Sequence, residues 1–179
     1  MKKLTVLLLS IGVILAPSTA AASSHAKSLQ NLGMNEIMFA QMMIPHHKQA
    51  ISISETALKK SQNQSILKLS RQIKGAQSSE ISQMTYWLKA TNSSMTMDHD
   101  MKMSGMLTVK ELALLKSLTG SEFDRKFLQL MIKHHQGALE MIDLISDSKN
   151  AEAKALSRAI NSAQSKEITS MQQLLKRIK

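Results

Sequence analysis

Two similar segments of fifteen residues, each with a His-His pair near its middle, constrain this chain more than any other feature. The copies read FAQMMIPHHKQAISI over residues 39–53 and FLQLMIKHHQGALEM over residues 127–141, a shift of 88 residues. The match resumes at a shift of 87, where residues 69–88 align with residues 156–175. Four of the six histidines belong to this duplication, which predicts a fold made of two related halves.

Apolar residues in both halves recur at spacings of three and four, the period of an amphipathic helix. This pattern predicts long helices over about residues 35–60, 64–90, 121–145 and 150–178. Two helical hairpins with short turns, joined by a long connection, are typical of an all-α four-helix bundle. The duplicated helical hairpin is therefore the expected unit of this fold.

Capping residues and a proline refine these predictions. Thr108 and Glu111 have the spacing of a capping box and predict a short helix that ends at Gly120. Ser121 and Asp124 have the same spacing and predict the start of the third long helix. Pro45 removes a backbone donor within the first helix, so a kink is expected just before its histidines.

Counting residues from each turn places histidines and glutamates at one depth of the bundle. His46 precedes the first turn by about as many residues as Glu80 follows it, and His134 and Glu167 stand likewise around the second turn. At about 1.5 Å per residue, each His and its Glu differ in depth by roughly one helical turn. The layer is therefore expected to hold the four duplicated histidines with Glu80, Glu167, Gln77, Gln164 and several methionines.

Each His-His pair follows a methionine at a spacing that puts all three side chains on one helical face. Imidazole suits copper, zinc, iron and nickel, thioether sulfur favours Cu(I), and a nearby carboxylate can orient a metal-bound imidazole. A buried His-Glu layer can equally be a satisfied polar network that fixes the helix register. The candidate ligands are Met43 with His46 and His47, and Met131 with His134 and His135, backed by Glu80 and Glu167.

The connection between the halves breaks the helical period and alternates methionine with polar residues. Such a segment offers no apolar face to bury on a helix, whereas flexible thioethers with an imidazole can wrap a soft ion such as Cu(I) or Ag(I). The alternative is a loop whose methionines scavenge oxidants as sulfoxide. The candidate ligands of this segment are Met95, Met97, His99, Met101 and Met103.

The N-terminus carries the signals of export. Two lysines, an apolar run over residues 4–16 and a stretch of small residues predict a signal peptide cleaved after Ala22. His25 would then be the third residue of the mature chain, where the amine, two amides and the imidazole suit Cu(II) or Ni(II). With cleavage elsewhere, His25 is a surface residue only. We expect the protein in the periplasm or outside the cell, with no membrane span.

Composition narrows the function further. The chain has no cysteine, so soft-metal ligands must be Met or His. The formal charge of +10 comes from scattered lysines and arginines with few aromatic residues, which argues against a nucleic-acid role. Positions 43 and 131 are Met, so the Glu-x-x-His motif of di-iron bundles is missing. No catalytic nucleophile stands out, and we expect no enzyme. A His/Met haem site remains conceivable, though the two glutamates disfavour its apolar pocket.

The segments MIPHHKQA and MIKHHQGALEM, each followed one helix later by Gln-x-x-Glu-Ile-x-x-Met, resemble the DUF305 family over about residues 34–179. The resemblance implies a ferritin-like bundle outside the cytoplasm with Met/His copper sites and a role in copper tolerance. A family methionine seven residues after the first His is kept as Met141 but replaced by Ile53. The motif positions carried over are Met43, His46, His47, Met131, His134 and His135.

The residues and the resemblance together predict an exported protein that sequesters Cu(I) or hands it to other periplasmic copper proteins. Cu(II) is a second oxidation state to consider, and Ag(I) is a surrogate. The alternative is a structural or interaction module of the cell envelope without metal. The expected segments are a signal peptide (1–22), a flexible segment (23–33) and a bundle (34–179) made of repeat one (34–90), a Met-rich connection (91–120) and repeat two (121–179).

Overall fold

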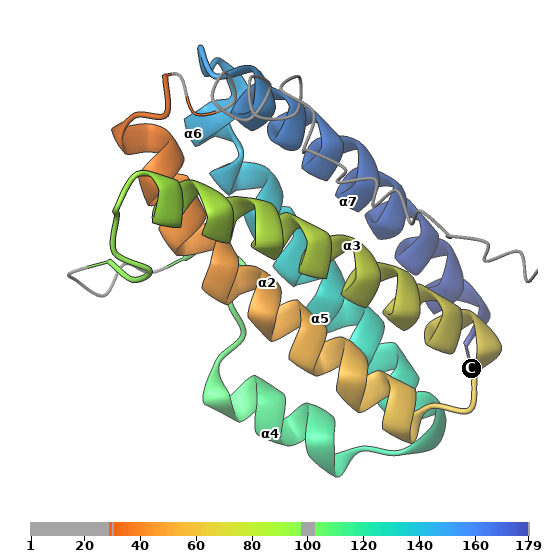
Figure 1. The fold of residues 1–179 in the computed structure, drawn as a ribbon. Helices are drawn as coiled ribbons and strands as arrows, with labels where there is room; N and C mark the ends of the chain where they lie inside the picture. The colour runs from red at the N-terminus through yellow and green to blue at the C-terminus, as the bar shows by residue number, and fades with distance from the viewer. Residues whose placement is uncertain (1–28, 30, 98–102, 179) are drawn as a thin grey trace, which may run out of the picture.

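The computed structural model describes residue 29, residues 31–97 and residues 103–178. These residues form helices and no strand, which confirms the all-α prediction (Figure 1). Within them, no helix is both long enough and apolar enough to cross a membrane. The helices are α2 (Met34–Lys60), α3 (Gln64–Ala90), α4 (Val109–Ser117), α5 (Gly120–Met141), α6 (Asp143–Ser146) and α7 (Ala151–Arg177).

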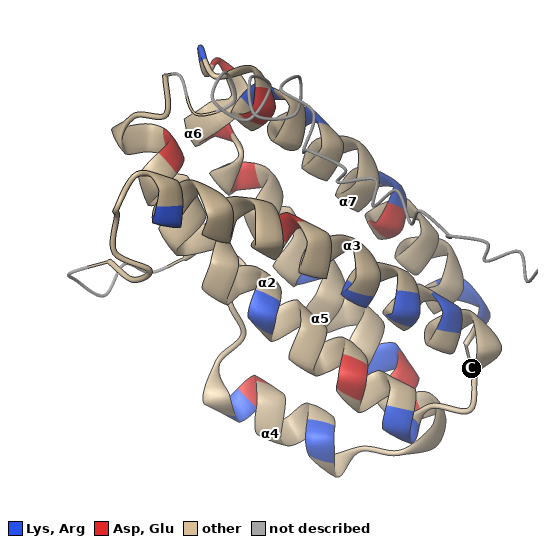
Figure 2. Ribbon diagram, in the orientation of Figure 1, with Lys and Arg blue, Asp and Glu red and all other residues tan. Residues whose placement is uncertain are grey.

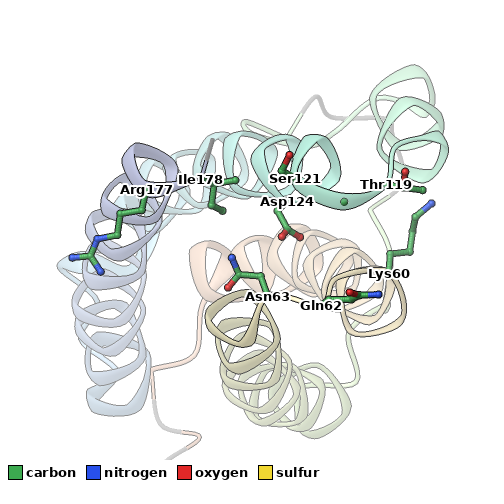
Figure 3. Close-up of a pocket in the computed structure, with 9 residues that line it drawn as sticks. Lys60, Gln62, Asn63, Thr119, Ser121, Asp124, Arg177 and Ile178 are labelled. Atoms are coloured by element: carbon green, nitrogen blue, oxygen red, sulfur yellow. The ribbon is translucent and has the colours of Figure 1, made fainter.

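Four long helices make the bundle, and the end-on view of Figure 3 shows them around a common centre. α2 and α3 form the first hairpin, and α5 and α7 form the second, with the short α6 in the turn between them. α2 and α5 pack against each other, whereas α3 and α7 have few contacts. α4 lies outside the bundle and packs on α5 (Figure 1).

The same turn chemistry closes both hairpins. Ser61 Oγ accepts a hydrogen bond of 3.1 Å from the amide of Asn63, whose side chain caps α3. In the second hairpin, Ser148 Oγ accepts one of 2.9 Å from the amide of Asn150, which caps α7. Asparagine at a helix N-cap satisfies amides that have no partner within the helix. The duplication thus extends to the turns.

The third long helix differs from its prediction at both ends. Its N-cap is Thr119, which makes no side-chain cap bond, so the predicted capping box of Ser121 and Asp124 is wrong. Gly120, at φ 56°, opens α5 and does not end α4, which stops at Ser117. The helix also ends at Met141 and not near residue 145. Apolar burial continues through α6, so periodicity alone could not reveal that break.

The capping box of the short helix α4 is confirmed. Thr108 Oγ1 accepts from the amide of Glu111 at 3.2 Å, and the Glu111 carboxylate accepts from the amide of Thr108 at 2.8 Å.

The first long helix runs through Pro45 without interruption.

The buried apolar side chains form two clusters, one toward each end of the bundle. The first cluster contains Phe39, Ala40, Met42, Met43, Ile44, Met84, Trp87, Leu88, Ala138, Met141, Ile142, Ile145, Ala153, Leu156 and Ile160. The second cluster contains Ala50, Ile53, Ala57, Ile66, Leu69, Ile73, Leu107, Leu115, Phe123, Phe127, Leu128, Leu130, Met131 and Met171.

Candidate metal centre

The two apolar clusters are separated by a level at which all four long helices carry polar side chains. On α2, Ile44 belongs to the first cluster and Ala50 to the second. On α3, which runs the opposite way, Ile73 belongs to the second cluster and Met84 to the first. The same change occurs on α5 and α7. The polar residues at this level, the polar layer, are His46, His47, Gln77, Glu80, His134, His135, Gln164 and Glu167.

The second histidine of each pair is held by a glutamate. His47 Nε2 donates to Glu80 at 2.6 Å, and His135 Nε2 donates to Glu167 at 2.7 Å. Both imidazoles are fully buried, whereas the glutamate side chains are 15% and 19% exposed. Carboxylates in this position orient metal-binding histidines in proteins. The predicted His-Glu layer is therefore present.

The sequence placed the first histidine of each pair, His46 or His134, at the depth of a glutamate. In the structure these two histidines contact each other and not the glutamates. The rings of His46 and His134 lie 3.7 Å apart between centroids and are tilted by 35°. Adjacent helical residues point about 100° apart, so one histidine of each pair faces the other hairpin while its neighbour faces a helix of its own hairpin. His46 Nε2 also donates to the carbonyl of Ser104 at 3.1 Å.

Burial keeps the stacked histidines neutral. Loss of solvent, followed by the neighbouring His47, lowers the pKa of His46 to about 3, although the Ser104 carbonyl opposes this effect. Loss of solvent and the nearby imidazoles, His46 first, also hold the pKa of His134 well below its ordinary value. The backbone carbonyl of His46 opposes that shift. Protons therefore compete weakly for the lone pairs of this stack.

Unpartnered polar atoms are concentrated in the polar layer. Among the described side chains, eleven buried nitrogen or oxygen atoms lack a hydrogen-bond partner, and eight of them lie in the layer. Such atoms cost about 1–3 kcal/mol each when they stay unpaired, so a cluster of them indicates a bound water or ion. The eight are Nδ1 of His46, His47 and His135, both ring nitrogens of His134, both amide atoms of Gln77 and Oε1 of Gln164.

Part of the connection crosses the polar layer. Residues 103–107, which we call the strap, start at Met103 against the first cluster and end at Leu107 in the second. Gln49 binds Leu107 twice, with Nε2 donating to its carbonyl at 3.0 Å and Oε1 accepting from its amide at 2.8 Å. Between these ends lies Ser104, which binds His46 through its carbonyl and Glu140 through its hydroxyl.

Two glycines allow the strap to lie directly on α5. A Cβ atom at Gly137 would lie 2.1 Å from the carbonyl oxygen of Ser104. A Cβ atom at Gly105 would lie 2.8 Å from the carbonyl oxygen of His134, and Gly105 has φ 76°. Sequence reasoning missed this contact. A glycine inside an amphipathic helix, as at Gly137, was the available sign of a close backbone approach.

The predicted methionine ligands that the structure describes do not gather at one point. Met43 and Met141 lie in the first cluster, and Met131 lies in the second. Met97 and Met103 pack against the first cluster, whereas Met95 is 40% exposed. The predicted ligands His25, His99 and Met101 lie outside the described residues.

The residues of the polar layer fit a soft ion better than a hard one. Among the described residues, no three His, Asp or Glu side chains are arranged to hold a metal ion. The layer instead offers imidazole nitrogens without hydrogen-bond partners, with thioether sulfurs in the clusters on both sides. Imidazole and thioether together favour Cu(I) over magnesium or calcium.

Neither a surface pocket at one end of the bundle nor the surface charge coincides with this centre. A pocket of about 480 Å³ lies at the far end of the bundle, where Asp124 points into it between Asn63 and Lys60 (Figure 3). Among the residues that the structure describes, none of the predicted ligands lines that pocket. Figure 2 shows lysines and arginines spread over several helices, in agreement with the scattered charge read from the sequence.

Solved structures share this fold. A DUF305 protein from Streptomyces coelicolor, described as a candidate secreted protein, is 27% identical with a TM-score of 0.76, covering 80% of this chain and 93% of that one. A DUF305 fragment from Deinococcus radiodurans is 31% identical with a TM-score of 0.74, covering 81% and 97%.

CopM in its Cu(I)-bound form is 30% identical with a TM-score of 0.67, covering 79% of this chain and 96% of that one. Structures of CopM bound to Ag and to Cu(II) are similar as well. No curated protein matches the chain. The model of the domain of unknown function DUF305 matches residues 36–175. This chain belongs to the DUF305 family.

Proposed function

We propose that this protein is an exported copper-binding protein that takes up Cu(I), and also Cu(II), as cargo. The observation that carries the proposal is the concentration of unpartnered buried polar atoms in the polar layer. A purely structural layer would be expected to pair these atoms with one another, because unpaired polar groups reduce stability.

The histidines supply the nitrogen donors of the proposed site. His46, His47 and His135 each use Nε2 in a hydrogen bond, so their Nδ1 lone pairs remain for an ion. His134 has both ring nitrogens without a partner. The glutamates behind His47 and His135 are placed to make these rings better donors.

Thioether sulfur supplies the preference for a monovalent ion. Met43 and Met141 belong to the first cluster, against which Met97 and Met103 of the connection also pack. Sulfur ligands select Cu(I) and similar soft ions over zinc or magnesium. We therefore propose that Cu(I) enters the layer preferentially from the side of the first cluster. Met131, on the side of the second cluster, is then the weaker donor.

The relatives support the choice of copper and of an exported location. CopM has this fold and is solved with Cu(I), Cu(II) and Ag. The Streptomyces relative is described as a candidate secreted protein, in agreement with the signal peptide expected over residues 1–22. The proposed role contains no chemical reaction, and its partners are the ion and other copper proteins outside the cytoplasm.

Anaerobic titration of the mature protein with Cu(I) against a competing chelator tests the proposal, with Ag(I) as a redox-inert check. We expect tight binding that weakens when His46 and His134 become Gln, and lower stoichiometry when Met95, Met97, Met101 and Met103 become Leu. Met171→Leu is the matched control, because this buried methionine lies in the second cluster and has no predicted role. A wild-type protein that ignores both ions would contradict the proposal.

A further inference from the structure

We propose that Gln77 and Gln164 are positioning residues of the ion site, and that one of their amide oxygens accepts the N–H of His134 when an ion is bound. The inference rests on the proposed function, because it concerns the same layer. It assigns a role to two side chains that the Met/His interpretation leaves unexplained.

The hydrogen bonds of the four imidazoles in the layer support this role. An imidazole that binds an ion is neutral, with one lone pair for the ion and one N–H that needs an acceptor. Three acceptors are present: Glu80 for His47, Glu167 for His135 and the Ser104 carbonyl for His46. His134 makes no such hydrogen bond, although both of its ring nitrogens are buried. One imidazole of the layer is therefore without a bonded acceptor.

Two glutamines of the same layer carry buried amide oxygens that could serve as this acceptor. Gln77 is 2% exposed and Gln164 is 3% exposed, and the Oε1 atoms of both are without a partner. Each stands one helical turn before the glutamate that holds a histidine, on α3 and α7 respectively. Within the described side chains, the other unpartnered oxygens belong to Ser54, Ser70 and Asp124, which lie outside the polar layer.

The positions of Gln77 and Gln164 also argue against a role as filler. Both occupy core-facing positions, where Leu or Met would bury the same volume without an unpaired amide. Keeping a buried amide without a partner lowers the stability of the metal-free fold, so its retention needs a benefit in another state. Ion binding, which fixes the His134 ring and its N–H, provides that state.

One competing acceptor is present. The carbonyl of His46 lies near the His134 ring and favours its charged form. That carbonyl belongs to the helical ladder of α2, and neither His134 nitrogen bonds to it. If it were the acceptor in the ion-bound state, the glutamines would be dispensable for binding.

Single replacements Gln77→Leu and Gln164→Leu, compared with the wild type, test the inference. Gln72→Leu on the exposed face of α3 is the matched control. We expect at least one of the two buried replacements to weaken Ag(I) binding about tenfold, the usual effect of losing a partner behind a metal ligand. The same variant bound to Ag(I) should lose the single tautomer of His134 in ¹⁵N NMR spectra, and the corresponding Gln77→Glu or Gln164→Glu replacement should restore it.

The metal-free protein gives the independent readout. Because both amide atoms of Gln77 and Oε1 of Gln164 are unpartnered there, Gln→Leu should leave the denaturation midpoint unchanged or raise it. A lowered midpoint with unchanged Ag(I) affinity and an unchanged His134 tautomer in both variants would overturn the inference and make the amides structural. Failure of the wild type itself to bind Ag(I) or Cu(I) is a different result, which removes the proposed function and this inference together.

Discussion

The two sides of the polar layer descend from one duplicated segment but have diverged in their sulfur content. On the first side, Met42, Met43, Met84 and Met141 are buried together, and methionines of the connection pack against them. On the second side, the buried methionines are Met131 and Met171, surrounded by Phe, Leu and Ile. Duplication thus supplies a symmetric scaffold of histidines and glutamates, while divergence places soft donors mainly at one end.

The contact with the strap shows the same divergence at one pair of equivalent positions. Gln49 and Gly137 correspond under the shift of 88 residues. Gln49 binds the backbone of Leu107 through its amide, whereas Gly137 leaves room for the backbone of Ser104 and Gly105. One copy holds the strap by hydrogen bonds and the other by close approach, so the strap is fixed across the layer from both halves.

The largest expected effect is on stability in acid. It tests the two stacked histidines, His46 from the first half and His134 from the second. Burial lowers the folded-state pKa of His46 to about 3 and that of His134 well below 6.5. Between pH 6.5 and 4.5 the unfolded chain therefore binds protons that the folded chain excludes, and stability falls as the pH falls. At about 1.4 kcal/mol per pH unit and histidine, the metal-free protein should lose about 5 kcal/mol, measured by denaturation at several pH values.

His46→Gln and His134→Gln separate the two contributions, and each should reduce this loss by about half. The pKa of Glu111 is lowered to about 2, first by its hydrogen bond to Lys133, so that carboxyl stays ionised throughout the window. A pH slope that both replacements leave unchanged would show that the stacked pair does not control acid stability.

Gly137→Ala should have the next largest effect. The added methyl group would lie 2.1 Å from the Ser104 carbonyl oxygen, so the strap or α5 must shift, at about 1–3 kcal/mol of unfolding free energy. Gly75→Ala on α3 is the matched control, because no atom lies within 4 Å of its Cβ and alanine stabilises a helix by about 0.5–1 kcal/mol. Chemical denaturation of both variants measures the difference. Equal stability would mean that the strap is not pressed against α5.

Gln49→Ala tests the equivalent position in the other half. It removes two hydrogen bonds to Leu107, each worth about 1 kcal/mol, without creating a steric clash. We expect a loss of stability similar to that of Gly137→Ala, and faster hydrogen exchange of the Leu107 amide. An unchanged exchange rate would show that the strap is held from one side only.

Matched pairs of methionine replacements test the unequal sulfur content directly. Met43→Leu with Met141→Leu removes buried thioethers from the first side, and Met131→Leu with Met171→Leu does so on the second. Leucine nearly preserves volume, so both double variants should fold. We expect Ag(I) affinity to fall about tenfold in the first variant, or about 1.4 kcal/mol, and less in the second. Equal losses would show that the two sides contribute equally.

Local periodicity was sufficient to predict that four long helices exist and the depth of the histidines, but not where α5 begins and ends. It could not choose which histidine of a pair meets the glutamate, because His46 and His47 differ by one step around the helix and the choice depends on where α5 packs. The position of the strap could not be predicted from the sequence for a similar reason. Its contacts join Ser104 and Gly105 to Gly137, and only the folded arrangement brings these backbones together.

The smallest effect concerns the two turns, which bury their caps to different extents. Asn150 is 1% exposed and caps α7, whereas Asn63, its equivalent in the first hairpin, is partly exposed and caps α3. Loss of an asparagine cap costs about 0.5–2 kcal/mol. The stability cost of Asn150→Ala should lie near the upper limit of this range, because water cannot replace a buried acceptor. The cost of Asn63→Ala should lie near the lower limit. Thermal unfolding of the two single variants measures this difference, and equal costs would mean that burial of the cap adds nothing to the turn.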